Sequence, residues 1–297
     1  MGALPRGFMQ GLCEVSLCGN GCLGCAGGMA RIFAKKKGSV VLKLAGVSVS
    51  IGAARILRDV SFEIVAGEVF GLVGESGSGK SMTALAAMGL LPRGAKVNGA
   101  VTFQGQPLLE MGERALCDLR GREIGMIFQE PLTALNPLHK VGDQVTETLR
   151  VHGVASGAHA VEIAIERLER VGLTPAQSFF DRYPHELSGG QRQRVCIALA
   201  VALRPKLLIA DEPTTALDVT TQAQILELLK DLVADEGMGL WLITHDLARR
   251  AKQRLGRAHF HQFAIAHHRH MVRHIRHHRQ IMGDQPKRHL LFVNQPF

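Results

Sequence analysis

The chain has 297 residues with a formal net charge of +9, and 46% of its residues are apolar. This length is sufficient for one α/β domain plus a smaller helical subdomain, and no segment approaches the roughly eighteen consecutive apolar residues that a membrane-spanning helix needs. Residues 248–297 hold eleven of the 35 Lys and Arg residues but only one of the 26 acidic residues, so the remainder is nearly neutral and we expect no nucleic-acid partner.

We expect residues 1–38 to form an atypical leader that is rich in Gly and Cys and lies outside the folded domain. The leader has little charge and no continuous apolar core, unlike a secretory signal. Its four cysteines have spacings that match no common zinc or iron–sulfur pattern: Cys13, Cys18, Cys22 and Cys25. A disordered leader is the favoured interpretation, and a metal site is the alternative.

The next elements surround a glycine-rich loop. Residues 40–64 are predicted to form antiparallel strands, residues 68–73 a buried strand, and residues 82–91 a helix that ends before Pro92. Backbone N–H groups of such a loop and the following helix N-terminus favour phosphate binding. Lys80 is therefore predicted to bind the β- and γ-phosphates of a nucleotide, and Ser81 a Mg²⁺ ion. The loop has the complete G-x-x-x-x-G-K-[ST] pattern: Gly74, Glu75, Ser76, Gly77, Ser78, Gly79, Lys80 and Ser81.

The middle of the chain is predicted to contain a strand and two helices. A strand at 124–128 is followed by Gln129, and helical spacing is found at 146–150 and 160–171. The second helix has an apolar stripe, which is more often a buried core face than a partner surface. The stripe consists of Ile163, Ile165, Leu168 and Val171.

Beyond these helices, strands and helices continue to alternate, which predicts a mainly parallel sheet covered on both sides. An apolar strand at 207–212 ends in Asp211 and Glu212, and a strand at 240–244 is followed by His245. A helix between them, at 221–233, has one apolar face made of Ile225, Leu228, Leu229 and Leu232. A run of polar and small residues that precedes a helix comes before the strand at 207–212: Ser188, Gly189, Gly190 and Gln191.

In this order, the motifs resemble those of the ATP-binding cassette (ABC) ATPases. The resemblance implies that Asp211 holds Mg²⁺ and that Glu212 polarises the water attacking the γ-phosphate. It also implies that Gln129 contacts Mg²⁺ and this water, that His245 contacts the γ-phosphate, and that Asp218 lies in a loop coupling two active sites. The 188–191 run matches the family signature, which faces an ATP held by a second subunit.

Segments 128–138, 141–144 and 182–187 narrow the resemblance to importers of oligopeptides, dipeptides and nickel. The fold implied is an α/β P-loop NTPase with a RecA-like, mainly parallel sheet, an antiparallel β subdomain and a helical subdomain at about 130–190. The ATPase domain would occupy 39–247. The cofactors implied are ATP and Mg²⁺. The partners implied are permease subunits, a second identical or paralogous ATPase subunit and, indirectly, an extracellular or periplasmic solute-binding protein. The location implied is peripheral, on the cytoplasmic face of the inner membrane.

Two features depart from this pattern. Relatives place an aromatic residue near position 51 to stack on adenine, and this chain has Ile51. After residue 247 the resemblance stops, and residues 248–297 contain nine of the fourteen histidines interleaved with arginines. This tail is interpreted as an out-of-frame or rearranged gene end, with a histidine metal-binding tract or a basic nucleic-acid arm as alternatives.

Two rival functions are weighed against an importer ATPase. A soluble ABC ATPase acting on DNA or ribosomes would be expected to carry two cassettes or a long coiled-coil insertion, and this sequence contains neither. A truncated or frameshifted remnant that binds nucleotide without productive transport stays open because of the tail.

Overall fold

The computed structural model describes residues 30–32, 38–74, 77–130 and 134–244. Several predictions fall outside these residues: those for the leader cysteines, Glu75, Ser76, His245 and the 248–297 tail. Among the described residues, no helix is long and apolar enough to cross a membrane.

The first part of the chain contains an antiparallel sheet with the strand order β3-β2-β5-β6. Strand β2 lies at its centre and pairs antiparallel with both β3 and β5, as expected for residues 40–64. Its inward-facing residues, such as Leu42 and Leu44, are buried because side chains alternate between the two faces of a strand. The strands are β2 (Val40–Ile51), β3 (Ala54–Val65), β5 (Ala95–Phe103) and β6 (Gln106–Pro107).

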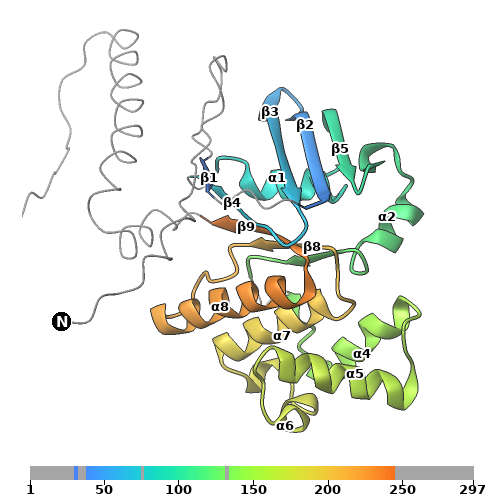
Figure 1. Ribbon diagram of the computed structural model, residues 1–297, viewed down its shortest axis with the longest axis vertical. Helices are drawn as coiled ribbons and strands as arrows, with labels where there is room; N and C mark the ends of the chain where they lie inside the picture. Colours follow the sequence, from blue (N-terminus) through green and yellow to red (C-terminus); the bar gives the residue numbers. More distant parts are fainter. Residues whose placement is uncertain (1–29, 33–37, 75–76, 131–133, 245–297) are drawn as a thin grey trace, which may run out of the picture. The chain divides into compact units, whose positions relative to one another are not determined.

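A second, five-stranded sheet has the order β1-β4-β9-β8-β7 (Figure 1). Neighbours from β4 to β7 pair in parallel, whereas β1 is antiparallel to β4. The mainly parallel sheet predicted from alternating strands and helices is thereby confirmed. Because parallel strands end at the same edge, the residues that follow β4, β8 and β7 meet there. The strands are β1 (Ala30–Ile32), β4 (Val69–Val73), β7 (Ile124–Ile127), β8 (Leu207–Asp211) and β9 (Gly239–Thr244).

The parallel sheet has a separate hydrophobic core on each face. Successive residues of β8 face opposite sides: Leu208 packs in the core of helices α7 (Gly189–Val201) and α8 (Val219–Glu236), and Ile209 packs in the other core. That second core includes the antiparallel sheet and α1 (Lys80–Ala87). Figure 1 accordingly shows α1 on one side of the sheet and α7 and α8 on the other.

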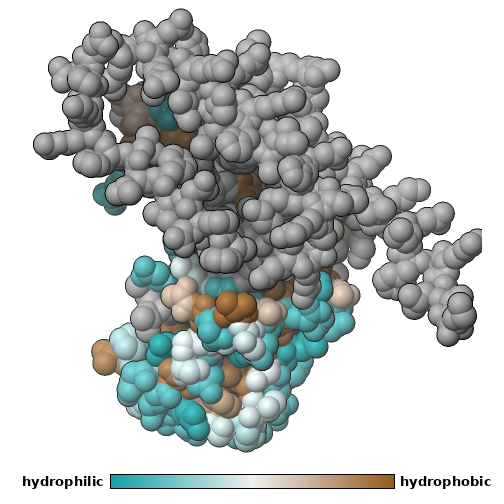
Figure 2. Space-filling view, turned by 90° about the vertical axis from the view of Figure 1, so that its left-hand side faces the viewer, coloured by the Kyte–Doolittle hydropathy of each residue, from teal (hydrophilic) through white to brown (hydrophobic). Residues whose placement is uncertain are grey.

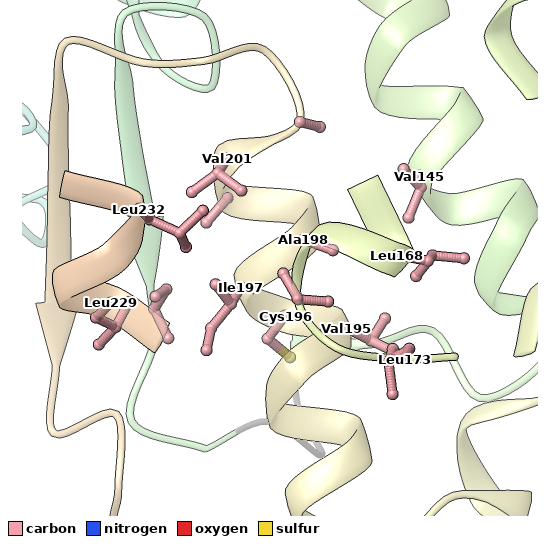
Figure 3. Packing of buried hydrophobic residues seen from close by; sticks show 14 of the residues in the cluster. Val145, Leu168, Leu173, Val195, Cys196, Ile197, Ala198, Val201, Leu229 and Leu232 are labelled. Carbon is pink, nitrogen blue, oxygen red and sulfur yellow. The ribbon is translucent and has the colours of Figure 1, made fainter. Parts of the chain in front are cut away.

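Helix α7 occupies the centre of the larger core. It is apolar on more than one side, because it packs on the sheet, on α8 and on the helical region. Its fit against β7 is close: a Cβ atom added at Gly125 would lie 2.3 Å from the carbonyl oxygen of Ala200. Figure 3 shows α7 between two groups of side chains, Leu229 and Leu232 of α8 and Val145 and Leu168 of the helical region.

The helical region lies between the end of β7 and the start of α7. Leu168 in its second long helix and Val171 directly after that helix are fully buried, and Ile165 packs against the larger core. The apolar stripe is therefore mainly a core face, as favoured. The region contains α4 (Val141–Val151), α5 (Gly157–Arg170), α6 (Ala176–Phe180) and a 3-10 turn, η2 (Pro184–Glu186). A shorter insertion after β6 contains η1 (Leu108–Glu110) and α2 (Glu113–Leu119).

Several helix boundaries differ from their predictions, and one of these differences has a clear cause. Helix α1 ends at Ala87 rather than Leu91. Gly89 has a φ of +66°, a left-handed conformation that glycine adopts without steric cost and that commonly ends helices. The N–H of Leu90 then donates to the carbonyl of Leu85 at 2.8 Å. Gly89, rather than Pro92, is therefore the stop signal.

The outer surface of the described residues is mixed. On the face seen in Figure 2, hydrophilic residues predominate and hydrophobic ones are scattered among them. Leu138, in the helical region, has the largest exposed fraction among the exposed large hydrophobic residues, at 81%. Isolated exposed apolar side chains are ordinary for a folded protein and indicate no site by themselves.

Candidate active site

The glycine-rich loop after β4 contains left-handed backbone conformations that glycine adopts readily. Gly77 and Gly79 have φ values of +79° and +90°, which side-chain-bearing residues rarely adopt. At Gly79 the space is also closed, since an added Cβ would lie 2.6 Å from Leu57 Cδ2. At the described residues 77–79 the loop therefore leads directly into the N-terminus of α1, an arrangement that suits phosphate binding.

Lys80 lies across this loop. Its side chain is buried, with 5% of the residue exposed, and its Nζ donates to the carbonyl oxygen of Gly74 at 2.9 Å. Thr83 fixes the same turn from α1, because its Oγ1 donates to the carbonyl oxygen of Gly79 at 3.0 Å. A buried ammonium group held at the mouth of an anion-binding loop is suited to a phosphate group.

Asp211, at the end of β8, is a buried carboxylate beside the start of α1. Burial is the largest influence on the Asp211 carboxyl and raises its pKa. Repulsion by Glu212 raises this pKa further, whereas a hydrogen bond with the Ser81 side chain and the charge of Lys80 partly lower it. Within the described residues, its Oδ1 has no hydrogen-bond partner. A buried carboxylate oxygen without a partner is costly unless a cation binds it.

This arrangement fits a Mg²⁺ ion bound together with phosphates. No group of three or more His, Cys, Asp and Glu side chains among the described residues could hold a metal alone. Mg²⁺ in nucleotide sites needs only one or two carboxylates, because phosphates and water supply the other ligands. The Asp211 carboxylate and the Ser81 hydroxyl are such a minimal set.

Glu212 continues from Asp211 and is held in a defined position. Its backbone has a φ of +49°, an uncommon conformation for a residue with a side chain, and its N–H donates to the carbonyl of Ile243 at 2.9 Å. Its Oε2 accepts hydrogen bonds from Gln129 Nε2 at 3.0 Å and from Thr215 Oγ1 at 3.1 Å. The carboxylate of Glu212 thus meets the side chain that follows β7.

The 188–191 run begins helix α7. Ser188 is the N-cap residue: its Oγ accepts the N–H of Gln191 at 3.3 Å, and Gln191 Oε1 accepts the N–H of Ser188 at 2.9 Å. This reciprocal capping box has the sequence pattern Ser-x-x-Gln, which the sequence interpretation did not use. A Cβ at Gly190 would lie 2.7 Å from Thr221 Cγ2, so the motif packs closely on the start of α8.

The loop between Glu212 and α8 is fixed by the side chains of Gln222 and Asp218, of which the sequence interpretation named only Asp218. Gln222 Nε2 donates to the carbonyl oxygens of Thr214 and Leu217 at 3.0 and 2.9 Å. Asp218 caps α8 by accepting the N–H of Thr221 at 2.9 Å. Hydrogen bonds from the side chain and the backbone of Thr221 lower the pKa of the Asp218 carboxyl. The pattern Asp-x-x-Thr before an apolar helix predicts the cap, but no local pattern indicates Gln222.

Most of the predicted catalytic and metal-binding residues meet in one place. The structure brings Asp211 and Ser81 together, and it joins Glu212 to Gln129. The 188–191 run instead contacts Leu217 and Thr221 of its own chain, on the side of the sheet opposite α1. Ile51 is half-buried at the end of β2 and pairs with Ala54 and Ala95.

Comparisons with known proteins give one consistent family. A family model described as "ABC transporter" matches residues 57–215. The chain is 55% identical over 199 residues to "Peptidoglycan transport ATP-binding protein YejF" of Agrobacterium fabrum, covering 66% of this chain and 36% of that protein. It is 50% identical over 196 residues to "Oligopeptide transport ATP-binding protein OppD" of Salmonella typhimurium, covering 66% of this chain and 58% of that protein.

A solved structure is also similar. The chain is 32% identical to the protein in "Dimeric structure of a post-hydrolysis state of the ATP-binding cassette MJ0796 bound to ADP and Pi", with a TM-score of 0.59. This likeness covers 69% of this chain and 88% of that one. The chain therefore spans most of a solved cassette but only 36% and 58% of the length of the two curated relatives.

Proposed function

We infer that this chain, which belongs to the ABC transporter family, binds and hydrolyses ATP to power solute uptake through a partner permease. The observation that carries the inference is the meeting of Lys80, Ser81 and Asp211 at the sheet edge where Glu212 contacts Gln129. The names of the two curated relatives, which refer to peptidoglycan and oligopeptide transport, favour a peptide as the solute over nickel.

ATP and Mg²⁺ would be bound by the loop and the adjacent carboxylate. Backbone N–H groups of the loop and the Nζ of Lys80 bind the phosphates, which requires Lys80 to exchange its hydrogen bond with Gly74 for one with a phosphate oxygen. Ser81, Asp211 and Gln129 would hold the Mg²⁺ ion, which would supply positive charge to neutralise the phosphates.

Glu212 is the base in the hydrolysis step. A water molecule attacks the γ-phosphorus, its proton passes to the Glu212 carboxylate, and the bond to the bridging oxygen breaks, so that ADP and phosphate leave. Gln129 orients the water and Glu212, to which it is already hydrogen bonded at 3.0 Å. His245, which lies outside the described residues, is assigned to the γ-phosphate by resemblance.

A second ATPase subunit completes each site. Within one chain, the signature run lies on the α7 and α8 side of the sheet, whereas the phosphate-binding loop leads into α1 on the other side. Ser188, Gly189, Gly190 and Gln191 would therefore contact a nucleotide bound by the partner subunit. The similar solved cassette is described as dimeric, which supports this arrangement.

The assembly would lie on the cytoplasmic face of the inner membrane. Peripheral association through permease subunits fits a chain whose described residues contain no helix able to span the bilayer. A periplasmic or extracellular binding protein would deliver the solute without touching this chain. The ATPase domain is proposed to occupy 39–247, with its helical subdomain at about 130–190.

Steady-state ATP hydrolysis by the purified chain and its Glu212→Gln variant tests the proposal. Removing a general base typically costs about 10²–10⁴-fold in rate, and the variant is expected to retain ATP binding and to accumulate an ATP-bound dimer, seen by light scattering. Glu227→Gln is the matched control, since Glu227 is exposed on α8 and pairs with Lys230. Wild-type protein without turnover would identify the chain as a remnant, and turnover undiminished in Glu212→Gln would remove Glu212 from its role.

A further inference from the structure

Thr215 is joined to Glu212 by two hydrogen bonds. The N–H of Thr215 donates to the backbone carbonyl of Glu212 at 3.1 Å, and the Oγ1 of Thr215 donates to the Oε2 of Glu212 at 3.1 Å. The first bond closes a turn and the second reaches the carboxylate that is assigned to water activation. The hydroxyl of Thr215 is thus in direct contact with the proposed base.

The backbone that carries Thr215 is itself firmly held. On one side, the N–H of Glu212 is tied to β9 through the carbonyl of Ile243 at 2.9 Å. On the other side, Gln222 of α8 donates to the carbonyls of Thr214 and Leu217, which flank Thr215 and the residue after it. Because both ends of the turn are anchored, the Thr215 hydroxyl is a fixed donor rather than a mobile one.

The two side-chain donors to Glu212 differ in what else they must do. Gln129 comes from the end of β7, and in the proposed function it also contacts Mg²⁺ and the attacking water. Its amide then has less capacity left for Glu212. Thr215 has no such second task in the proposed function, and its hydroxyl has one proton to donate.

We propose that Thr215 is a positioning residue for hydrolysis: its hydroxyl holds one oxygen of Glu212 so that the other oxygen faces the attacking water. This proposal rests on the proposed function, because it needs Glu212 to be the base. Loss of the hydroxyl leaves this Glu212 oxygen with Gln129 as the remaining one of these two donors, so the carboxylate is less often in the productive orientation.

Two substitutions at Thr215 separate positioning from packing. Thr215→Val keeps the shape and removes the donor, and it is expected to lower kcat by about tenfold to a hundredfold, the range for a lost hydrogen bond to a charged group. The KM for ATP should stay within about twofold, since Thr215 acts through Glu212 and not on the nucleotide. Thr215→Ser keeps the donor and is expected to restore most of kcat.

Thr146→Val is the matched control. Thr146 also uses its hydroxyl in one hydrogen bond, to the carbonyl of Asp143 at 2.9 Å, but it lies on α4 in the helical region. Its kcat should equal that of the wild type. Melting temperature and ATP binding are measured for every variant, so that a loss of folding is recognised directly.

The outcomes distinguish the two claims. Wild-type kcat in Thr215→Val overturns the positioning role, as does an equal loss of kcat in Thr215→Val and Thr215→Ser, which would show that the shape of the turn matters and the hydroxyl does not. A raised KM with unchanged kcat would likewise overturn it. An inactive wild-type chain, by contrast, refutes the proposed function itself.

Discussion

Replacing Asp211 by Asn is expected to stabilise the nucleotide-free chain while removing its response to Mg²⁺. Burial raises the pKa of the Asp211 carboxyl, so the folded state holds this proton more tightly than the unfolded state does. As pH rises from the ordinary Asp range through the raised folded value, the folded state therefore loses stability relative to the unfolded state. Above the raised folded value that cost is present in full, and the neutral amide of Asn avoids it.

The size of the effect follows from the surroundings of Asp211. Leaving a buried polar atom without a partner costs about 1–3 kcal/mol. Asp211 is 5% exposed and its Oδ1 is unpartnered within the described residues, but the hydrogen bond with Ser81 and the charge of Lys80 offset part of the cost. We therefore expect a gain of about 1 kcal/mol, which raises Tm by about 2–4 °C in a domain of this size.

Thermal unfolding, followed by circular dichroism with and without Mg²⁺ and ATP, measures both effects. Ligand at a hundredfold excess over its Kd stabilises a protein by about 2.7 kcal/mol, and the Mg²⁺-dependent part of this shift should be absent in Asp211→Asn. Asp231→Asn, an exposed change on α8, is the control and should leave Tm and the Mg²⁺ response unchanged. A lower Tm for nucleotide-free Asp211→Asn, or a full Mg²⁺ response, would refute the reasoning.

Two further predictions concern the packing around α7. Gly125→Ala should destabilise the chain by about 1–3 kcal/mol through overpacking, because its Cβ would lie 2.3 Å from the Ala200 carbonyl oxygen. In the control Gly112→Ala, nothing lies within 4 Å of the added Cβ, so the melting temperature should be nearly unchanged. Equal melting temperatures of the two variants would contradict the close fit. Burial raises the pKa of the Cys196 thiol to about 12, so brief iodoacetamide treatment of the folded chain near pH 8 should modify exposed Cys117 and spare Cys196 in peptide mass spectra. Rapid native labelling of Cys196 would show that this part of the core opens.

The elements around the glycine-rich loop could be predicted from the sequence because their signals are local. The apolar run 69–73 and the G-x-x-x-x-G-K-[ST] pattern specify a strand, a tight turn and a helix start within a few residues of each other. The strand is β4 (Val69–Val73) and the helix begins at Lys80. The helix starts at Lys80 rather than Met82, and it ends at Ala87 because Gly89 stops it before Pro92 can.

The contacts within the site could not be predicted in the same way. Gln129 and Glu212 are 83 residues apart, and their hydrogen bond exists because β7 and β8 are neighbours in the sheet. Strand order of this kind depends on the packing of the whole domain rather than on any motif. The Thr215 hydroxyl is only three residues from Glu212, yet its bond depends on the left-handed backbone of Glu212, which the sequence does not specify.

The close fit of α7 against β7 gives this helix a mechanical role. Helix α7 has 13 residues and is therefore about 20 Å long, with Ser188 at one end and Ala200, pressed on Gly125, near the other. Because Ala200 packs directly on Gly125, a displacement of α7 is expected to move β7. If a partner's nucleotide binds Ser188, as proposed, its engagement would therefore act on β7 four residues before Gln129.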